Sequence, residues 1–160
     1  SDGGNSFTTK TTSNSNLSNN SVYHVFAATD GVIYVAVNSI DGGLQVSTNG
    51  GTSFFQKTTV DGLAYNFIVG EIYKDSNNVL YVGTRVGLSI STDEASSFSN
   101  RKIDQGLGSN KIVSIFVDSD KIYVGTEGGL SISTDGGNSF TNDTSADGLG
   151  HDKVNSVYVR

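Results

Sequence analysis

The sequence predicts an all-β protein built from repeated small sheets, and three observations support this prediction. The aliphatic residues are mostly Val and Ile, in short runs separated by Gly, Asn, Asp, Ser and Thr. This composition favours strands and turns over helices. No stretch shows apolar residues at the 3.6-residue spacing of an amphipathic helix. The third observation is an internal repeat, which occurs four times along the 160 residues.

The repeat is a polar turn that is closed by a Phe. The four copies occupy residues 1–7, 47–54, 91–98 and 133–140. Their acidic or amide positions, which lie 47, 44 and 42 residues apart, are Asp2, Asn49, Asp93 and Asp135. The blades of four-stranded β-propellers recur at about the same interval, roughly 40–50 residues. The period therefore indicates propeller blades.

Each residue type in the turn has a structural use. A hydroxyl lies two positions before the acid, at Ser47, Ser91 and Ser133. Such hydroxyls and carboxylates accept hydrogen bonds from turn N–H groups, as in Asx-turns. The closing aromatic residues are expected to fill the space between neighbouring sheets, and they are Phe54, Phe98 and Phe140. These polar turn residues, Asp2 included, are therefore interpreted as structural.

Strand-like runs recur in phase with the turns and predict four antiparallel strands in each blade. The first strands begin at Val22, Val69, Ile112 and Val154, if the repeats are aligned on their apolar residues. Within one repeat region over residues 1–160, complete blades are expected at 20–59, 65–102 and 110–144. Residues 1–19 would hold one outer strand (6–11) and a loop, and 153–160 one inner strand of a further blade.

Three blades are fewer than a closed ring needs, because closed propellers typically have four to eight. The exposed flanks would be an edge liability. The chain is thus expected to be part of a longer chain or to assemble with other copies as a homo-oligomer. Its start inside a repeat and its lack of Met favour the first alternative.

The four turns resemble the Asp-box (BNR) repeats of sialidases and many other propellers, whose pattern is Ser-x-Asp-x-Gly-x-Ser/Thr-aromatic. Residues 124–130, Val-Gly-Thr-Glu-Gly-Gly-Leu, also resemble the regulator-propeller repeats of bacterial sensor proteins. The pattern is broken at Asn49, which replaces the acid, and at Ala95, which replaces the apex Gly; both turns should be weaker. The resemblance implies a propeller fold and a bacterial extracellular or periplasmic location.

Composition argues against several function classes. The net charge is −6 and no basic stripe is present, so nucleic-acid binding is not expected. No stretch approaches the length needed to span a bilayer, so membrane insertion is not expected either. There is no Cys, and the two His occupy unlike positions of the repeat. No metal and no cofactor are therefore expected.

The loops that join one blade to the next are longer than the turns within blades, which is typical of a binding surface. On that face we single out tentative ligand-binding residues, namely Tyr65, Arg85, Asp104, Glu127 and His151. For each of them a solvated loop position is the simpler interpretation. Arg85 and Glu127 lie in equivalent turns of successive blades, where they could form a surface ion pair.

Enzymatic activity is not expected. Sialidases clamp a carboxylate with three Arg, but Arg85, Arg101 and Arg160 fall at unlike positions, and there is no Trp to bind a glycan chain. The preferred hypothesis is a non-catalytic binding or scaffold module that recognises a glycan or a protein through its long loops. Two alternatives stay open: a fragment of an Asp-box glycoside hydrolase whose catalytic residues lie elsewhere, and a self-assembling propeller unit.

Overall fold

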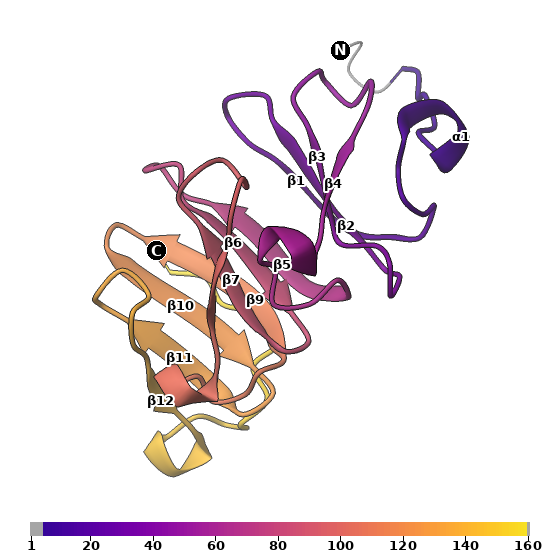
Figure 1. The fold of residues 1–160 in the computed structure, drawn as a ribbon. Helices are drawn as coiled ribbons and strands as arrows, with labels where there is room; N and C mark the ends of the chain where they lie inside the picture. The colour runs from indigo at the N-terminus through magenta and orange to yellow at the C-terminus, as the bar shows by residue number, and fades with distance from the viewer. Residues whose placement is uncertain (1–4, 160) are drawn as a thin grey trace.

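A computed structural model describes residues 5–159. The expected three four-stranded antiparallel sheets are present, each with its strands hydrogen-bonded in sequence order (Figure 1). The first sheet consists of β1 (Val22–Ala27), β2 (Ile33–Val37), β3 (Leu44–Ser47) and β4 (Phe55–Lys57). The second consists of β5 (Ile68–Lys74), β6 (Leu80–Thr84), β7 (Gly87–Ser91) and β8 (Ser99–Arg101). The third consists of β9 (Ile112–Asp118), β10 (Lys121–Thr126), β11 (Gly129–Ser133) and β12 (Thr141–Asp143).

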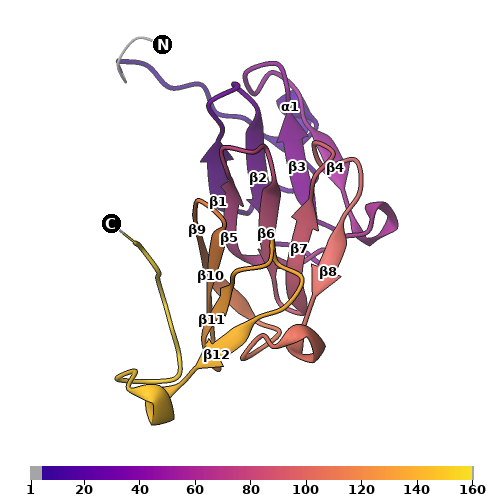
Figure 2. The same cartoon turned by 90° about the vertical axis from the view of Figure 1, so that its left-hand side faces the viewer.

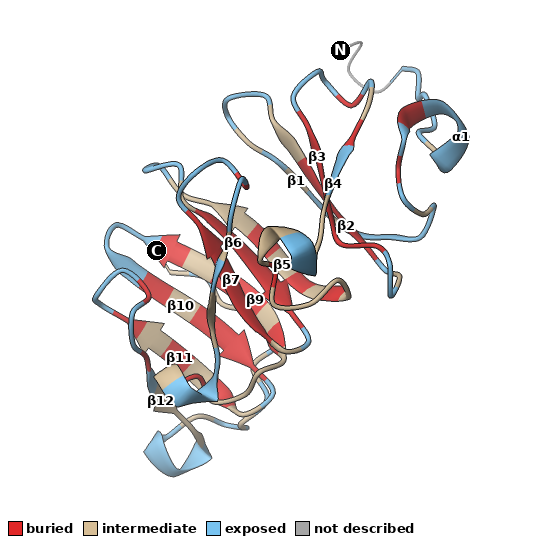
Figure 3. Cartoon of the chain, viewed as in Figure 1, coloured by how far each residue is buried: buried red, intermediate tan, exposed pale blue. Residues whose placement is uncertain are grey.

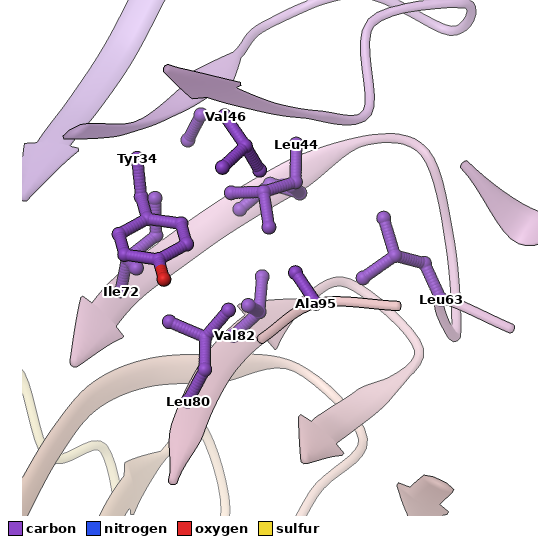
Figure 4. Close-up of a cluster of buried hydrophobic side chains, with 10 residues drawn as sticks. Tyr34, Leu44, Val46, Leu63, Ile72, Leu80, Val82 and Ala95 are labelled. Atoms are coloured by element: carbon purple, nitrogen blue, oxygen red, sulfur yellow. The ribbon is translucent and has the colours of Figure 1, made fainter. Parts of the chain in front are cut away.

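The sheets fan out face to face, with the first strands β1, β5 and β9 lying next to one another (Figure 1). Two continuous apolar cores fill the spaces between them. The core between the first two sheets includes Tyr34, Leu44, Ile72, Leu80 and Val82 (Figure 4). A second core, between the second and third sheets, consists of Leu, Ile and Val residues together with Tyr81 and Phe140. The buried residues lie along the strands, and the connecting loops are mostly exposed (Figure 3).

Neighbouring sheets approach closely where a small residue lies in the second strand of a blade. Gly83 of β6 faces Ile112 of β9, and a Cβ at Gly83 would lie 2.9 Å from the Ile112 side chain. Gly125 of β10 faces Val154 in the same way, with Val154 Cγ1 3.0 Å from an added Cβ. In the first sheet the corresponding residue is Ala36, which is fully buried. A larger residue at these positions would force the sheets apart.

The long loops between blades contain short helices, which the sequence did not indicate. They are α1 (Thr12–Ser15) and the 3₁₀ helices η1 (Thr59–Asp61), η2 (Ile103–Gln105) and η3 (Ser145–Asp147). A Leu follows each loop helix, and Leu149 after η3 is half-buried. The other three are buried: Leu63 and Leu107 are 3% exposed and Leu17 is 6% exposed. Each of these Leu residues is therefore an apolar anchor that fixes its loop to the fold.

Two of the three closing Phe residues pack where expected, between sheets. Phe140 lies in the core between the second and third sheets, and Phe98 packs against the core between the first and second. Phe54 packs with Leu17 on the outward face of the first sheet. In the first and third blades the preceding loop also holds the Phe, since the Phe54 N–H donates to the Ser15 carbonyl and the Phe140 N–H to the Gln105 carbonyl.

Neither terminal segment forms the strand that was predicted. Residues 6–11 and 153–159 have no strand in the structure, since the sequence contains no second and third strands of a fourth blade to pair with them. The C-terminal segment nevertheless runs past the third sheet as an extended chain (Figure 2). Its Tyr158 ring meets Phe116 of β9 edge-on, with the ring centroids 5.3 Å apart. Asp2 and Arg160 lie outside the described residues.

The alignment of the first strands needs one correction. Both strands have seven residues, but β5 has one residue more than β9 between its two buried Ile positions, Ile68 and Ile72 against Ile112 and Ile115, and its pairing with β6 shifts register there. Ile68, and not Val69, therefore occupies the buried position of Ile112; both are 0% exposed. The extra residue is Glu71. Its carboxylate Oε2 accepts a hydrogen bond from the N–H of Ile115 in the next sheet, at 3.0 Å.

The Asp-box turns have the expected chemistry. In the third sheet the Ser133 Oγ donates to Asp135 Oδ1 at 2.8 Å and accepts from the Gly137 N–H at 2.9 Å. The Asp135 carboxylate also accepts from the Ser139 N–H at 3.0 Å and from the Ser139 hydroxyl at 2.6 Å. These hydrogen bonds hold the pKa of Asp135 far below its usual value, and the Ser139 hydroxyl contributes most.

The two irregular turns keep this arrangement. Asn49 Oδ1 accepts from the Ser53 N–H at 3.0 Å, but the Asn49 amide Nδ2 donates to the Ser53 hydroxyl, so that hydrogen bond runs in the reverse direction. In the second sheet, Glu94 and Ala95 adopt φ values of 59° and 64° where the other two turns have Gly. That left-handed backbone strains a residue with a Cβ. Ala95 is fully buried in the core between the first two sheets.

The outward flank of the first sheet exposes residues that are buried in the other blades. Val25 of β1 is 55% exposed, but its equivalents Ile72 and Ile115 are 0% and 1% exposed. Val22 is 44% exposed, against 0% for Ile112. The first sheet therefore lacks the neighbour that the repeat provides elsewhere.

We predict that this flank binds a hydrophobic dye or drives association of the chain, since Val22 and Val25 expose apolar surface that the other blades bury. Val25→Ser should reduce dye binding or association in sedimentation experiments and leave the urea midpoint nearly unchanged. Ile115→Ala, the matched change at the buried position, should lower the free energy of unfolding by about 2–4 kcal/mol. A monomer that binds no dye before the Val25 substitution would contradict the prediction.

The second prediction concerns Asp135. Asp135→Ala should lower the urea midpoint, because the carboxylate accepts the turn's hydrogen bonds. Asp135→Asn should lower it less, since Asn49 shows how an amide is accommodated at the same position. Equal midpoints for the two variants would refute the structural role of the carboxylate.

The third prediction concerns acid. The Ser97 hydroxyl and N–H lower the pKa of Asp93 to about 2, and the pKa of Asp135 is also lowered. In the unfolded chain an Asp has a pKa of about 3.9. Both groups therefore stabilise the fold above about pH 4, and this contribution is lost as the pH falls through their folded pKa values. The double variant Asp93→Asn/Asp135→Asn should show a flatter pH dependence of its urea midpoint below pH 4 than the parent chain.

Candidate ligand site on the loop face

The turns and loops separate onto two faces of the fan. One face, called here the Asp-box face, carries the Asp boxes and the turns between first and second strands. These turns come together around one hollow, which is lined by Asp75, Thr92, Asp120 and Asp135 among others. The opposite face, called here the loop face, carries the turns between second and third strands together with the long loops. There the Gly43 N–H of the first sheet donates to the Asn66 carbonyl of the following loop at 2.8 Å.

The loop face is hollowed where the inner strands begin. This axial cleft has a volume of about 340 Å³. Its polar lining is Tyr23, Arg85, Lys111, Glu127, Lys153 and Asn155. The lining comes from β1, β9, two turns of successive blades and the C-terminal segment, so the cleft exists only because the sheets are packed together.

Charge in the axial cleft is the opposite of charge in the whole chain. Three of the chain's ten basic residues line it, together with a single carboxylate, although the chain carries a net charge of −6. Lys111 Nζ lies 2.6 Å from Glu127 Oε1. The pKa of Glu127 is lowered, first by the hydrogen bond from Lys111 and further by the charges of Lys153 and Arg85. The cleft therefore keeps an excess of positive charge at neutral pH.

Arg85 connects this cleft to a second one. Its guanidinium lies over the Phe67 ring, 5.9 Å from the centroid. The same two residues line an adjoining apolar hollow with Tyr65, Ile40 and Val86. The structure thus brings Tyr65, Arg85 and Glu127 to one region of the loop face. The expected ion pair between Arg85 and Glu127 does not form, because Glu127 pairs with Lys111.

Asp104 and His151 lie elsewhere, in the outer loops. Asp104 is an exposed residue of η2, and neither residue lines the axial cleft or the adjoining hollow. The His151 Nδ1 accepts from the Lys153 N–H at 2.9 Å and so belongs to a local turn. The length of these loops was taken to indicate binding, but it has a structural use. The loop helices are capped by side chains; the Thr58 N–H, for example, donates to Asp61 Oδ2 at 2.9 Å.

Below the axial cleft lies an inner hollow of about 300 Å³, which sequence reasoning did not identify. It shares Tyr23, Val69, Val113 and Asn155 with the cleft and adds His24, Glu71 and Ser114 to its lining. Three buried side-chain polar atoms lack a hydrogen-bond partner in residues 5–159, and two of them are His24 Nδ1 and Ser114 Oγ. The sequence does contain a polar residue between apolar neighbours in each first strand. Whether these polar residues line a hollow depends on how the first strands pack together, which the sequence alone does not show.

Two of the three carboxylates that line the Asp-box hollow are already used by the fold. Asp75 Oδ1 accepts from the Asn77 and Val79 N–H groups, and Asp135 accepts from Ser133 and Ser139. Arg101 is also used on this side, since its Nε donates to the Gly137 carbonyl. It therefore does not converge with Arg85.

Within residues 5–159 no group of three or more His, Cys, Asp or Glu is placed to hold a metal ion. The same residues include no helix that is long and apolar enough to cross a membrane.

Comparison with known proteins gives the same fold. Residues 106–128 match the family model described as two component regulator propeller. Two of the similar solved structures are extracellular domains from B. thetaiotaomicron. One, of the hybrid two-component system BT3049, has a TM-score of 0.78 and 20% identity; the other, of the one-component system BT4673, has a TM-score of 0.71 and 18% identity. Each match covers 92% of this chain and 20% of the other.

An ancestral GH74 enzyme is also similar, with a TM-score of 0.59 and 20% identity over 82% of this chain and 19% of the enzyme. No curated protein matches the sequence. The chain spans about a fifth of the length of the solved structures named here. Residues 106–128 are thus a two-component regulator propeller repeat, and the chain has the fold of a segment of a larger β-propeller.

Proposed function

We propose that this chain is a non-catalytic recognition segment of an extracytoplasmic bacterial sensor propeller, which binds a glycan or a protein ligand on its loop face. The observation that carries the proposal is the axial cleft and its adjoining hollow, where Tyr65, Arg85 and Glu127 lie close to one another. Clefts of this size with a few converging polar groups are the usual form of small-ligand sites. The extracytoplasmic location rests on the likeness to extracellular sensor domains.

The contrast between the two faces supports this choice. On the Asp-box face the carboxylates of Asp75 and Asp135 are occupied by hydrogen bonds that hold the turns. On the loop face Arg85 is exposed, and its guanidinium lies over an aromatic ring that could also support a ligand. A side chain that the fold does not need for a turn is free to bind a ligand.

A second candidate, a glycoside hydrolase segment, is favoured only by the likeness to the GH74 enzyme. Glycosidases use two carboxyl groups, one of which must be protonated to act as the general acid. Glu127 is the only carboxylate in the axial cleft, and its ion pair with Lys111 lowers its pKa. Glu71, in the inner hollow, is held by the Ile115 N–H. This arrangement is the reverse of a general acid site.

The fourth prediction tests the loop face. The chain is applied to an array of glycans and immobilised bacterial surface proteins, and hits are titrated. Tyr65→Ala and Arg85→Ala should each weaken binding by roughly fivefold or more, the scale of a lost stacking or charge-assisted contact. Asp104→Ala, on the same face but outside the cleft, and Asp120→Ala, on the Asp-box face, should leave it unchanged.

Binding that is lost in Asp120→Ala but kept in Tyr65→Ala and Arg85→Ala would place the site on the wrong face. Release of new reducing ends from any bound glycan would contradict the non-catalytic function.

A further inference from the structure

We infer that Asn49 is a site of self-modification: the Gly50 nitrogen attacks the Asn49 side-chain amide, and hydrolysis of the resulting ring leaves an aspartate at this position. The reaction gives the Asp box of the first sheet the acid that its sequence lacks. Asn49 and Gly50 form the only Asn-Gly pair in the chain, and both are exposed in the turn between β3 and β4. No residue of the loop face takes part, so this inference and the proposed function are independent of each other.

The attacking atom is the Gly50 nitrogen. Only the Asn49 carbonyl carbon, Cα and Cβ separate it from Asn49 Cγ, so attack closes a small ring without bringing distant parts of the chain together. Gly50 offers no hindrance, because a Cβ built there would have nothing within 4 Å. Within residues 5–159 the Gly50 N–H donates no hydrogen bond, since Ser47 Oγ accepts from the Gly51 N–H instead. The nucleophile is therefore accessible and unpaired.

The electrophile is polarised by two donors of the turn. Asn49 Oδ1 accepts from the Ser47 hydroxyl at 2.9 Å and from the Ser53 N–H at 3.0 Å. Attack at Cγ moves negative charge onto this same oxygen, so both hydrogen bonds strengthen as the new bond forms, as in an oxyanion hole. The second sheet shows that the turn stabilises an anion at this place, since the hydroxyl and N–H of Ser97 lower the pKa of Asp93 to about 2.

The atoms of the reaction balance with water as the co-reactant. The Gly50 nitrogen gives its proton to water and bonds to Asn49 Cγ. The bond from Cγ to Nδ2 then breaks, and Nδ2 takes up a proton and leaves as ammonia. Water next adds to Cγ of the cyclic imide and breaks the bond to the Gly50 nitrogen, which regains a proton and restores the peptide. An amide has become a carboxylate, and the chain gains one negative charge without any oxidation or reduction.

The turn favours aspartate over isoaspartate, the product that forms when water opens the ring on its main-chain side. Isoaspartate leads the backbone through an additional methylene, which would displace the Gly51 and Ser53 N–H groups from their acceptors in the turn. An aspartate gains the arrangement of Asp135, whose carboxylate accepts from the N–H and hydroxyl of Ser139. The Ser53 hydroxyl, which accepts from Asn49 Nδ2, needs only to rotate in order to donate. The ionised product is a poor electrophile, so it accumulates.

The test compares the native chain with the same chain in denaturing urea at mildly alkaline pH. Peptide mapping by mass spectrometry follows loss of the Asn49 amide, and an isoaspartyl methyltransferase assay separates the two products. The native chain should convert about tenfold faster, less than the effect of a buried oxyanion hole because the turn is exposed. Aspartate should be its main product. Equal or slower conversion in the native chain, or isoaspartate as its main product, would overturn the inference.

Variants identify the groups that act. Ser47→Ala removes one donor and should slow the native chain towards the rate in urea, whereas Ser47→Thr keeps the hydroxyl and should keep the rate. Gly50→Ala should nearly stop the reaction, because a Cβ hinders the attacking nitrogen. Glu94 has a φ of 59° at the corresponding position, so the turn accepts a side chain there. Tyr65→Ala, on the loop face, should have no effect. Thermal unfolding checks that each variant is folded, and a folded Ser47→Ala chain with an unchanged rate would overturn the role of the donors.

The third sheet allows the reaction to be installed. Asp135→Asn places an Asn before Gly136, where the Ser133 hydroxyl and the Ser139 N–H both donate to the corresponding oxygen. This variant should return to aspartate at a rate similar to that of Asn49, whereas Asp93→Asn, which precedes a Glu, should convert far more slowly. An Asp135→Asn chain that keeps its amide would refute promotion by the turn.

Stability gives a readout of the product. The urea midpoint of the aged chain should rise towards that of Asn49→Asp, because the carboxylate accepts hydrogen bonds that the amide accepts only in part. A midpoint that falls as the amide is lost would show that the product does not fit the turn, and would overturn the selection of aspartate.

Discussion

The whole structure depends on covering the face of one sheet with the next. A four-stranded sheet of this size has two apolar faces and cannot be stable while both are in water. The second strand of each blade meets the first strand of the following blade, and at Gly83 and Gly125 the approach is so close that a side chain would not fit. Glycine at these sites lets Ile112 and Val154 pack directly on the neighbouring backbone. The angle and spacing of the fan follow from this contact.

The loops and the Asp boxes support the same packing from the outside. Three of the long loops end in a buried Leu, namely Leu17, Leu63 and Leu107, and the loops before the first and third sheets also accept a hydrogen bond from the Phe N–H of the blade that follows. Each Asp box fixes the turn that delivers this Phe to the space between sheets. Asn49 and Ala95 show that the turn tolerates changes in charge and in backbone preference, because several hydrogen bonds act together. The recurring polar residues are thus explained by the architecture.

The residues that line the candidate ligand site are not those that hold the turns and the cores of the fold. The turns of the loop face place Arg85 and Glu127 beside the starts of the inner strands, where Lys111 and Lys153 join them. A positive cleft arises in an acidic chain because these residues meet only when the sheets are stacked. The regulator-propeller repeat and the extracellular domains with the same fold support the propeller architecture on which this cleft depends.

Much of the fold could be predicted from the sequence. The 42–47-residue period, the alternation in the strands and the Ser-x-Asp turns are local patterns, and each shows directly in the order of residues. Tyr65, Arg85 and Glu127 could be placed on the loop face for the same reason, since turn position within a blade is also local.

The rest was decided by tertiary packing. The sequence could not show that residues 6–11 and 153–159 lack strand pairing, because pairing needs partner strands. The extra residue Glu71 shifts a register that only the neighbouring strand reveals. The ion pair of Glu127 with Lys111, and the buried, unpartnered Ser114, likewise depend on contacts between residues far apart in the chain. The local sequence pattern specifies each blade. The cleft lies between blades, and its lining side chains are far apart in the sequence, so only the packing of the sheets determines which of them meet.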